Sequence, residues 1–138
     1  MPRPHVAVNA IIFTDHHTVL LTRRADNGLW CLPGGMVEER ESLSGALVRE
    51  LREEIHIISA LIRCTGIYSL PNVEIIPPAR GPLIVIAFEC AILGGTPTTS
   101  DEVIEVASFH ISSLPSLLPR HRDRIFHALT SPLLPYID

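Results

Sequence analysis

The sequence predicts an α/β fold, an α/β/α sandwich with a mixed β-sheet between helices. Three observations predict it. β-rich segments and two helical patterns follow in the order strands, helix, strands, helix. Apolar residues make up 46% of the chain and charged residues 19%, which excludes a disordered protein. The 138 residues contain no repeat or linker, so we expect a single domain over 1–138.

The first part of the chain is β-rich. Two segments are expected to pair as a hairpin, and a third, shorter one follows: 6–13, 18–24 and 29–32. The turn signals between them are Asp15-His16-His17 and Asp26-Asn27-Gly28. We expect Pro33-Gly34-Gly35 to end the third segment.

Segment 42–55 predicts a helix. It has no proline and one glycine, and Ser42 can cap its start. Leu47, Leu51 and Ile55, with Val48 beside them, form one apolar stripe at helical spacing.

The rest of the chain continues the pattern. Segments 57–70, 82–93 and 103–110 have strand composition, and 119–129 predicts a closing helix. Between the first two strands, 71–82 contains four prolines and is expected to be a loop.

Three glutamates of the predicted helix share one face. Glu50, Glu53 and Glu54 stand at i, i+3 and i+4, so their side chains project together and repel. Arg49 stands four residues before Glu53 and can hold it. The remaining charge favours a divalent cation, and carboxylate oxygens suit Mg²⁺ or Mn²⁺. Taken alone, the pattern is more typical of a solvated acidic face, because charged helix faces are common.

The surrounding spacing decides between these alternatives. Glu41 stands six residues after Gly35, and Arg49-Glu50-Leu51 begins eight residues after Glu41. Arg52-Glu53-Glu54 follows directly. A chance match of these positions anywhere in the chain is on the order of one in a million.

Segment 35–57 thereby resembles the Nudix box, and the lead-in 28–35 is similar to that of the Nudix hydrolase family. One position departs from the family pattern: His56 stands where the family has a glycine that ends the helix in the left-handed conformation. Histidine is among the residues enriched in that conformation, at a cost of about 1 kcal/mol. We expect His56 to end the helix in this way and not to bind a metal.

The resemblance implies roles for the acidic residues. Glu50, Glu53 and Glu54 are expected to hold the metal, with Glu53 or Glu54 as general base and Arg49 orienting a glutamate. A further ligand is expected from 101–105, and Glu102 is our candidate because it precedes a strand. A surface acid is the alternative there.

Five residues are candidates for substrate binding: Gly34, Gly35, Glu41, Arg23 and Arg80. The glycines let the backbone approach the substrate, and Glu41 corresponds to a family position that braces the helix. Arg23, with its neighbour Arg24, follows a strand that leads toward the site, and Arg80 ends the proline-rich loop. A surface ion pair is the alternative for each arginine.

The resemblance implies a Mg²⁺-dependent pyrophosphohydrolase that cleaves a phosphoanhydride bond in a nucleoside diphosphate-linked substrate. ADP-ribose and nucleoside triphosphates are the leading substrates, and the loop over 71–80 is expected to choose between them. The alternative is a catalytically silent Nudix-fold module that binds a nucleotide. Silent domains usually lose part of the Arg-Glu and Glu-Glu set, whereas Arg49, Glu50, Glu53 and Glu54 are all present here.

The composition of the chain limits the classes of partner and of chemistry that we expect. The net charge of −4 argues against nucleic-acid binding, and the absence of lysine excludes Schiff-base and Walker-type lysine chemistry. Three widely spaced cysteines are typical of a reduced compartment, and we expect a cytoplasmic protein with no membrane partner. Family relatives are often homodimers, so a homodimer is a further expectation.

Overall fold

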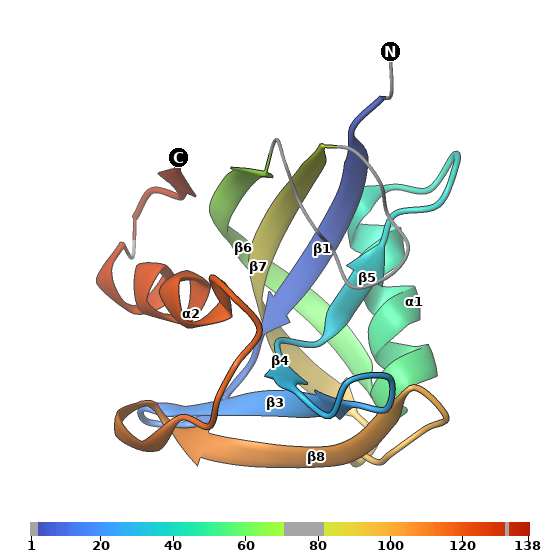
Figure 1. The fold of residues 1–138 in the computed structure, drawn as a ribbon, viewed down its shortest axis with the longest axis vertical. Coiled ribbons are helices and arrows are strands. Elements are labelled where there is room, and N and C mark those ends of the chain that lie inside the picture. The colour runs from blue at the N-terminus through green and yellow to red at the C-terminus, as the bar shows by residue number, and fades with distance from the viewer. Residues whose placement is uncertain (1–2, 71–81, 132) are drawn as a thin grey trace.

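The computed structural model describes residues 3–70, 82–131 and 133–138. Two helices and two sheets make up the fold (Figure 1). The strands are β1 His5–Ile11, β2 Phe13–Asp15, β3 Thr18–Arg24, β4 Trp30–Cys31, β5 Gly34–Met36, β6 Ile58–Leu70, β7 Leu83–Gly94, β8 Val103–His110 and β9 Tyr136–Ile137. The helices are α1 Leu43–Ile55 and α2 His121–Thr130, with a short 3-10 turn at Ile111–Ser113.

A five-stranded mixed sheet in the order β5-β1-β7-β6-β9 forms the centre of the molecule. β1 pairs parallel with β7, and β9 pairs parallel with β6, while the other neighbours are antiparallel. β3 pairs with β2, β4 and β8 in a second, antiparallel sheet. The predicted α/β/α sandwich is confirmed, and the second sheet is an addition that the sequence pattern did not indicate.

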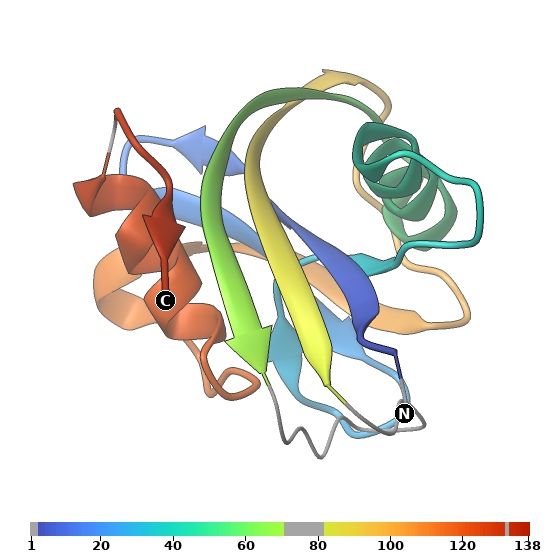
Figure 2. The same cartoon turned by 90° about the horizontal axis from the view of Figure 1, so that it is seen from above.

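The two helices cover opposite faces of the mixed sheet (Figure 2). Alternation along β1 shows this, because successive side chains of a strand point to opposite faces. Val8 and Ala10 pack in the core beneath α1, with Leu47 and Leu51. Ala7 and Ile11 pack in the core beneath α2, with Ile125 among others.

Helix α1 forms where the sequence predicted it. The backbone N–H of Gly45 donates to Oγ of Ser42 at 3.0 Å, which caps the first turn. Leu47, Leu51 and Ile55 of the predicted stripe are fully buried. This apolar face fixes the rotation of the helix and therefore the direction of its acidic face.

Some boundaries differ from the prediction. Gly34 and Gly35 do not end an extended segment but belong to β5, which pairs with β1. The predicted strand 6–13 breaks after Ile11, and the chain then begins β2. β9 was not predicted, because two residues give no periodicity. The predicted loop 71–82 lies, except for Pro82, outside the described residues.

Within the described residues, neither helix is long and apolar enough to cross a membrane.

His56 ends α1 in the left-handed conformation, with φ 62° and ψ 36°, as predicted. Its backbone N–H donates to the carbonyl of Arg52 at 3.1 Å. The side chain is exposed, and Nε2 of its ring lies within hydrogen-bond distance of the carbonyl oxygen of Thr99, at 3.1 Å.

Replacing His56 with Gly should stabilise the fold. Relief of the left-handed strain is worth about 1 kcal/mol, and loss of the exposed contact to Thr99 offsets part of it. Differential scanning calorimetry should show a higher Tm with unchanged turnover. Gly95→Ala is the opposite control, because its φ is 80° and an added Cβ would lie 2.6 Å from the carbonyl oxygen of His56. A lower Tm for His56→Gly would contradict this account.

Candidate active site

Arg49 stands at the centre of the acidic face of α1. Its guanidinium makes paired hydrogen bonds to the Glu41 carboxylate, Nε to Oε2 at 2.6 Å and Nη2 to Oε1 at 2.9 Å. Nη1 donates to Glu50 at 3.0 Å and to Glu53 at 3.2 Å. Nη2 also donates to the carbonyl oxygen of Met36 at 3.2 Å. One cation therefore joins three acids and the end of β5.

Glu41 braces the loop that leads into α1. Besides its bonds to Arg49, its carboxylate accepts the backbone N–H of Glu38 at 3.0 Å. These bonds hold the pKa of Glu41 at about 2, and the hydrogen bond from Arg49 is the main cause. The Arg49 guanidinium has its pKa raised by the same contact. Both groups therefore stay charged over the whole physiological range.

Glu50 and Glu54 form a pair of shielded carboxylates, of which Glu54 is buried and Glu50 half-buried. The side chain of Glu50 is 14% exposed and Glu54 is 9% exposed. Gly35 packs directly against Glu50, because a Cβ added there would collide with the carboxylate. The glycine thus leaves room for the acid beside β5.

Burial raises the pKa of both members of this pair. Desolvation is the main cause for each. The pKa of Glu54 rises to about 9, because its neighbour Glu50 adds to the effect of burial. Arg49 donates to Glu50 but makes no bond to Glu54 among the described residues. Glu54 is therefore the acid of α1 whose charge the protein compensates least.

Glu53 lies at the solvent edge of the same acidic face. Its side chain is 60% exposed and its carboxylate faces Arg49. Nη1 of Arg49 bonds both Glu50 and Glu53, and the charge of Glu53 acts on Glu50. The structure therefore keeps Glu53 beside Glu50 and Glu54, and Glu53 is the most exposed of the three.

Two charged residues at the edge of the second sheet act on Glu54. Glu102, which precedes β8, is near enough to raise the pKa of Glu54 further. Arg24, at the end of β3, acts in the opposite direction and lowers it. Arg24 also makes two hydrogen bonds to Asp26, at 2.9 and 2.6 Å.

Arg23 and Arg24 stand at the end of β3, where the register of its pairing with β8 shifts. Arg23 forms an ion pair with Glu105 at 2.7 Å and donates to the carbonyl oxygen of Gly28 at 2.8 Å. These contacts match the surface ion pair that was the alternative for Arg23. Arg24 is the neighbour whose charge reaches Glu54. Arg80, the other predicted arginine, lies outside the described residues.

Gly34 lies in β5 with φ 150°. A Cβ there would collide with the carbonyl oxygen of Val8 in the paired strand β1. Position 34 therefore requires a glycine, because β5 and β1 approach each other closely there.

Sequence reasoning missed a second polar group, beneath α2. Arg124 is buried and donates through Nη1 to Oδ1 of Asn9 at 2.7 Å. His121 is buried beside it, and its Nδ1 accepts the backbone N–H of Leu32 at 2.9 Å. A signal was available, because Arg124 shares the helical spacing of the buried residues Ile125 and Ala128.

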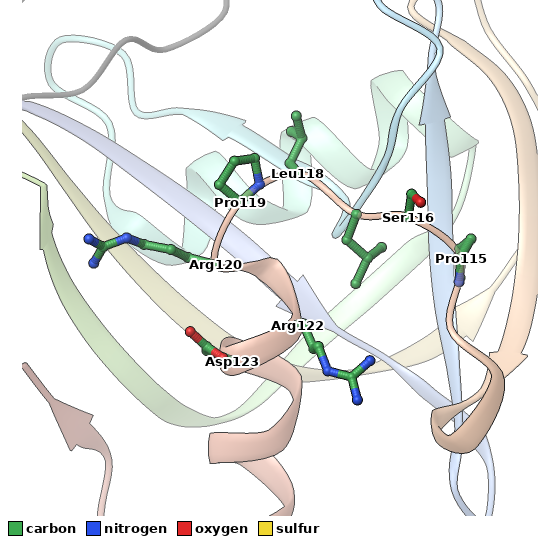
Figure 3. A pocket seen from close by; sticks show the side chains of 8 residues that line it. Pro115, Ser116, Leu118, Pro119, Arg120, Arg122 and Asp123 are labelled. Atoms are coloured by element: carbon green, nitrogen blue, oxygen red, sulfur yellow. The ribbon is translucent and has the colours of Figure 1, made fainter.

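A cavity of about 380 Å³ opens at the start of α2 (Figure 3). It is lined by Pro115, Ser116, Leu117, Leu118, Pro119, Arg120, Arg122 and Asp123. Figure 3 shows the side chains of Arg120 and Arg122 pointing in different directions from the helix start. The cavity is separate from the carboxylates of α1.

The carboxylates of α1 supply part of the ligand set that a metal ion needs. Over residues 3–70, 82–131 and 133–138, no three histidine, cysteine or acidic side chains are gathered closely enough to enclose an ion. Glu50 and Glu54 nevertheless fit a cation such as Mg²⁺, which is held by one or two carboxylates and completes its shell with water and substrate phosphates. The geometry that favours such an ion is the placement of Glu54, a buried carboxyl beside Glu50 with no bonded cation among the described residues.

Known proteins resemble this chain over nearly its whole length. The NUDIX domain family model matches residues 3–130. An ADP-ribose pyrophosphatase from Methanocaldococcus jannaschii is 35% identical over 120 residues, which cover 86% of this chain and 69% of that protein.

Two solved structures share the fold. A UDP-X diphosphatase superposes with a TM-score of 0.84 at 21% identity, covering 100% of this chain and 68% of that one. An ADP-ribose pyrophosphatase from Streptococcus suis has a TM-score of 0.77 at 25% identity, covering 99% of this chain and 100% of that one.

Replacing Arg49 with Lys tests the central ion pair. Lysine keeps the charge but not the planar fork, so the paired bonds to Glu41 and the bond to Met36 are lost. We expect the free energy of unfolding in urea to fall by about 1–3 kcal/mol. Arg52→Lys is the matched control, because Arg52 is exposed on the same helix. Equal effects of the two substitutions would argue against a central role for Arg49.

The stability of the metal-free protein should depend on Glu54. The carboxyl releases its proton near its ordinary pKa of 4.5 in the unfolded chain and near 9 in the folded one. The folded state therefore binds more protons between these values, and its stability is full below about pH 4.5 and falls as the pH rises toward 9. In EDTA, Glu54→Gln should flatten the profile of Tm against pH. A variant that keeps the slope of the parent would show that another group causes it.

Proposed function

The chain belongs to the NUDIX domain family and is a Nudix hydrolase, and from this premise we propose its substrate and cofactor. The proposed reaction is Mg²⁺-dependent cleavage of the phosphoanhydride bond in a nucleoside diphosphate-linked compound, with ADP-ribose as the leading substrate. The single observation that carries the proposal is the carboxylate pair of buried Glu54 and half-buried Glu50, with Glu50 packed against Gly35.

The choice of ADP-ribose rests on the relatives. A curated protein that is 35% identical, and a solved structure that is 25% identical over nearly the whole chain, are both ADP-ribose pyrophosphatases. A nucleoside triphosphate remains the second candidate from the sequence, and the substrate panel below separates the two.

Each residue of the site has a separate role in the proposed reaction. Glu50 and Glu54 would hold the cation, and Glu102 lies near enough to contribute charge. When bound, the metal neutralises phosphate charge and lowers the pKa of a water molecule. Arg49 fixes Glu50 and Glu53 in orientation. Gly35 keeps the edge of β5 clear beside Glu50.

A carboxylate must accept the proton of the attacking water. We propose Glu53 or Glu54 in this role, as the resemblance implies. The exposed carboxylate of Glu53 has solvent access, whereas that of Glu54 is buried against Glu50. A general base contributes about 10²–10⁴-fold to the rate, so the two can be told apart by substitution.

Hydrolysis should depend on a divalent metal and on Glu54. The test offers ADP-ribose, UDP-glucose, dGTP and oxidised dGTP with Mg²⁺ and then with EDTA, and the products are separated by chromatography. We expect turnover of ADP-ribose that EDTA abolishes. Glu54→Gln should lower kcat by about 10²-fold or more while keeping the fold. Glu39→Gln is the control, because Glu39 is an exposed acid in the turn before α1.

Glu53→Gln separates the roles of the neighbouring acids. If Glu53 is the base, kcat falls while Mg²⁺ still raises the Tm as in the parent. An active Glu54→Gln enzyme would mean that the metal lies elsewhere. No cleavage of any compound by a folded protein that Mg²⁺ stabilises would favour the silent nucleotide-binding module.

A further inference from the structure

The loop between β7 and β8, residues 95–102, is attached to the end of helix α1. The backbone N–H of Thr98 donates to the carbonyl oxygen of Ile55 at 3.0 Å. The ring of His56 reaches the next residue of the loop, with Nε2 at 3.1 Å from the carbonyl oxygen of Thr99. Because a carbonyl oxygen can only accept a hydrogen bond, Nε2 carries the hydrogen and is the donor. One backbone bond and one side-chain bond therefore hold the loop at the same point.

The loop also packs closely against the backbone of His56. Gly95 has φ 80°, and a Cβ added there would lie 2.6 Å from the carbonyl oxygen of His56. His56 itself is left-handed, with φ 62°. A glycine at position 56 would adopt this conformation without strain, but it has no side chain that could reach Thr99. The bond to the loop is therefore what the histidine provides and a glycine would not.

Glu102, the last residue of this loop, is held beside helix α1. Its carbonyl oxygen accepts the backbone N–H of Ala25, which follows β3, at 2.9 Å. The next residue, Val103, is buried in the core beneath α1. The backbone N–H of Ser100 donates to the carbonyl oxygen of Val103 at 3.0 Å and closes the turn around Glu102. The charge of Glu102 acts on Glu54, in agreement with this placement.

The side chain of Glu102 is exposed, so its position depends on the loop that carries it. A carboxylate that is not held in place loses conformational freedom when it binds a metal, and this loss weakens binding. Groups that fix a ligand from behind raise the metal affinity for the same reason. Thr99 stands three residues before Glu102, so the bond from His56 restricts the segment that bears the carboxylate.

We propose that His56 is a positioning residue, whose ring holds loop 95–102 so that Glu102 adds its carboxylate to the cation bound at Glu50 and Glu54. The inference rests on the proposed function and deepens it, because it names a residue outside the acids that sets the affinity for the cation. His56 touches neither the cation nor the substrate. Its substitution should therefore change the affinity for the metal and leave turnover at saturating metal unchanged.

Binding of Mn²⁺ alone tests the inference without hydrolysis. Free Mn²⁺ is measured by electron paramagnetic resonance during titration of the parent and of His56→Gly, and the Tm of both is measured in EDTA. We expect His56→Gly to bind Mn²⁺ about threefold or more weakly. Its Tm should nevertheless be higher, because the strain of the left-handed backbone is relieved. A residue that only stabilised the fold would move both quantities in the same direction. Equal affinity in the parent and His56→Gly overturns the inference.

Two further substitutions are matched controls. His17→Gly removes another exposed histidine with φ 62°, in the turn between β2 and β3. It should relieve comparable strain and leave the affinity for Mn²⁺ unchanged. His56→Gln keeps an N–H donor at nearly the same distance from the backbone and should restore the affinity of the parent. Weaker binding by His17→Gly, or binding by His56→Gln that is as weak as that of His56→Gly, overturns the inference.

A double-substitution cycle assigns the effect to Glu102. Glu102→Gln removes the charge that the loop contributes and should itself weaken Mn²⁺ binding. In that background His56→Gly should have little further effect, because the loop has no carboxylate left to position. Parent-like affinity of Glu102→Gln, or a full effect of His56→Gly in its background, overturns the inference.

The parent protein separates this inference from the proposed function. If the parent binds no Mn²⁺, the proposed metal site fails and the inference fails with it. If the parent binds Mn²⁺ and the substitutions of His56 have no effect, the inference alone fails.

Discussion

The bidentate ion pair between Arg49 and Glu41 is the interaction on which the site depends. Exposed ion pairs contribute little to stability, but this one is largely shielded, with side chains 18% and 17% exposed, and has fork-to-fork geometry. The same guanidinium bonds the carbonyl oxygen of Met36, so it fixes the end of β5 relative to α1. That position brings Gly35 against Glu50. The guanidinium of Arg49 thus fixes the positions of the loop at Glu41, of strand β5 and of Glu50 relative to one another.

Arg49 bonds only some of the carboxylates of the site, and the one that it leaves unbonded suits a catalytic metal. It reaches Glu41, Glu50 and Glu53, and Glu54 remains buried without a bonded cation among the described residues. The apolar stripe of α1 is fully buried and holds the helix in place against the repulsion of its acids. The free energy of unfolding of the metal-free protein is lowered by this arrangement, and a bound cation would restore it. The stability lost at Glu54 is therefore an expected property of a metal site.

The sequence predicted what local rules control. The stripe of Leu47, Leu51 and Ile55 gave the helix and the direction of its acids, and the cap at Ser42 gave its start. It did not show how unequally the three glutamates are exposed, because spacing places side chains on a face but does not show which of them neighbouring elements cover. It also did not indicate β5, since Gly34 and Gly35 have no strand propensity and pair only because β1 lies beside them. These failures all arise from tertiary contacts.

The strand β1 separates two opposite electrostatic environments. Its alternation places the acid-bearing helix on one face, and Asn9 with the buried Arg124 on the other. Arg124 bonds Asn9 on the face that α2 covers, and the carboxylates of the site stand on α1 over the other face. The packing of α2 can therefore vary without disturbing the carboxylates of α1.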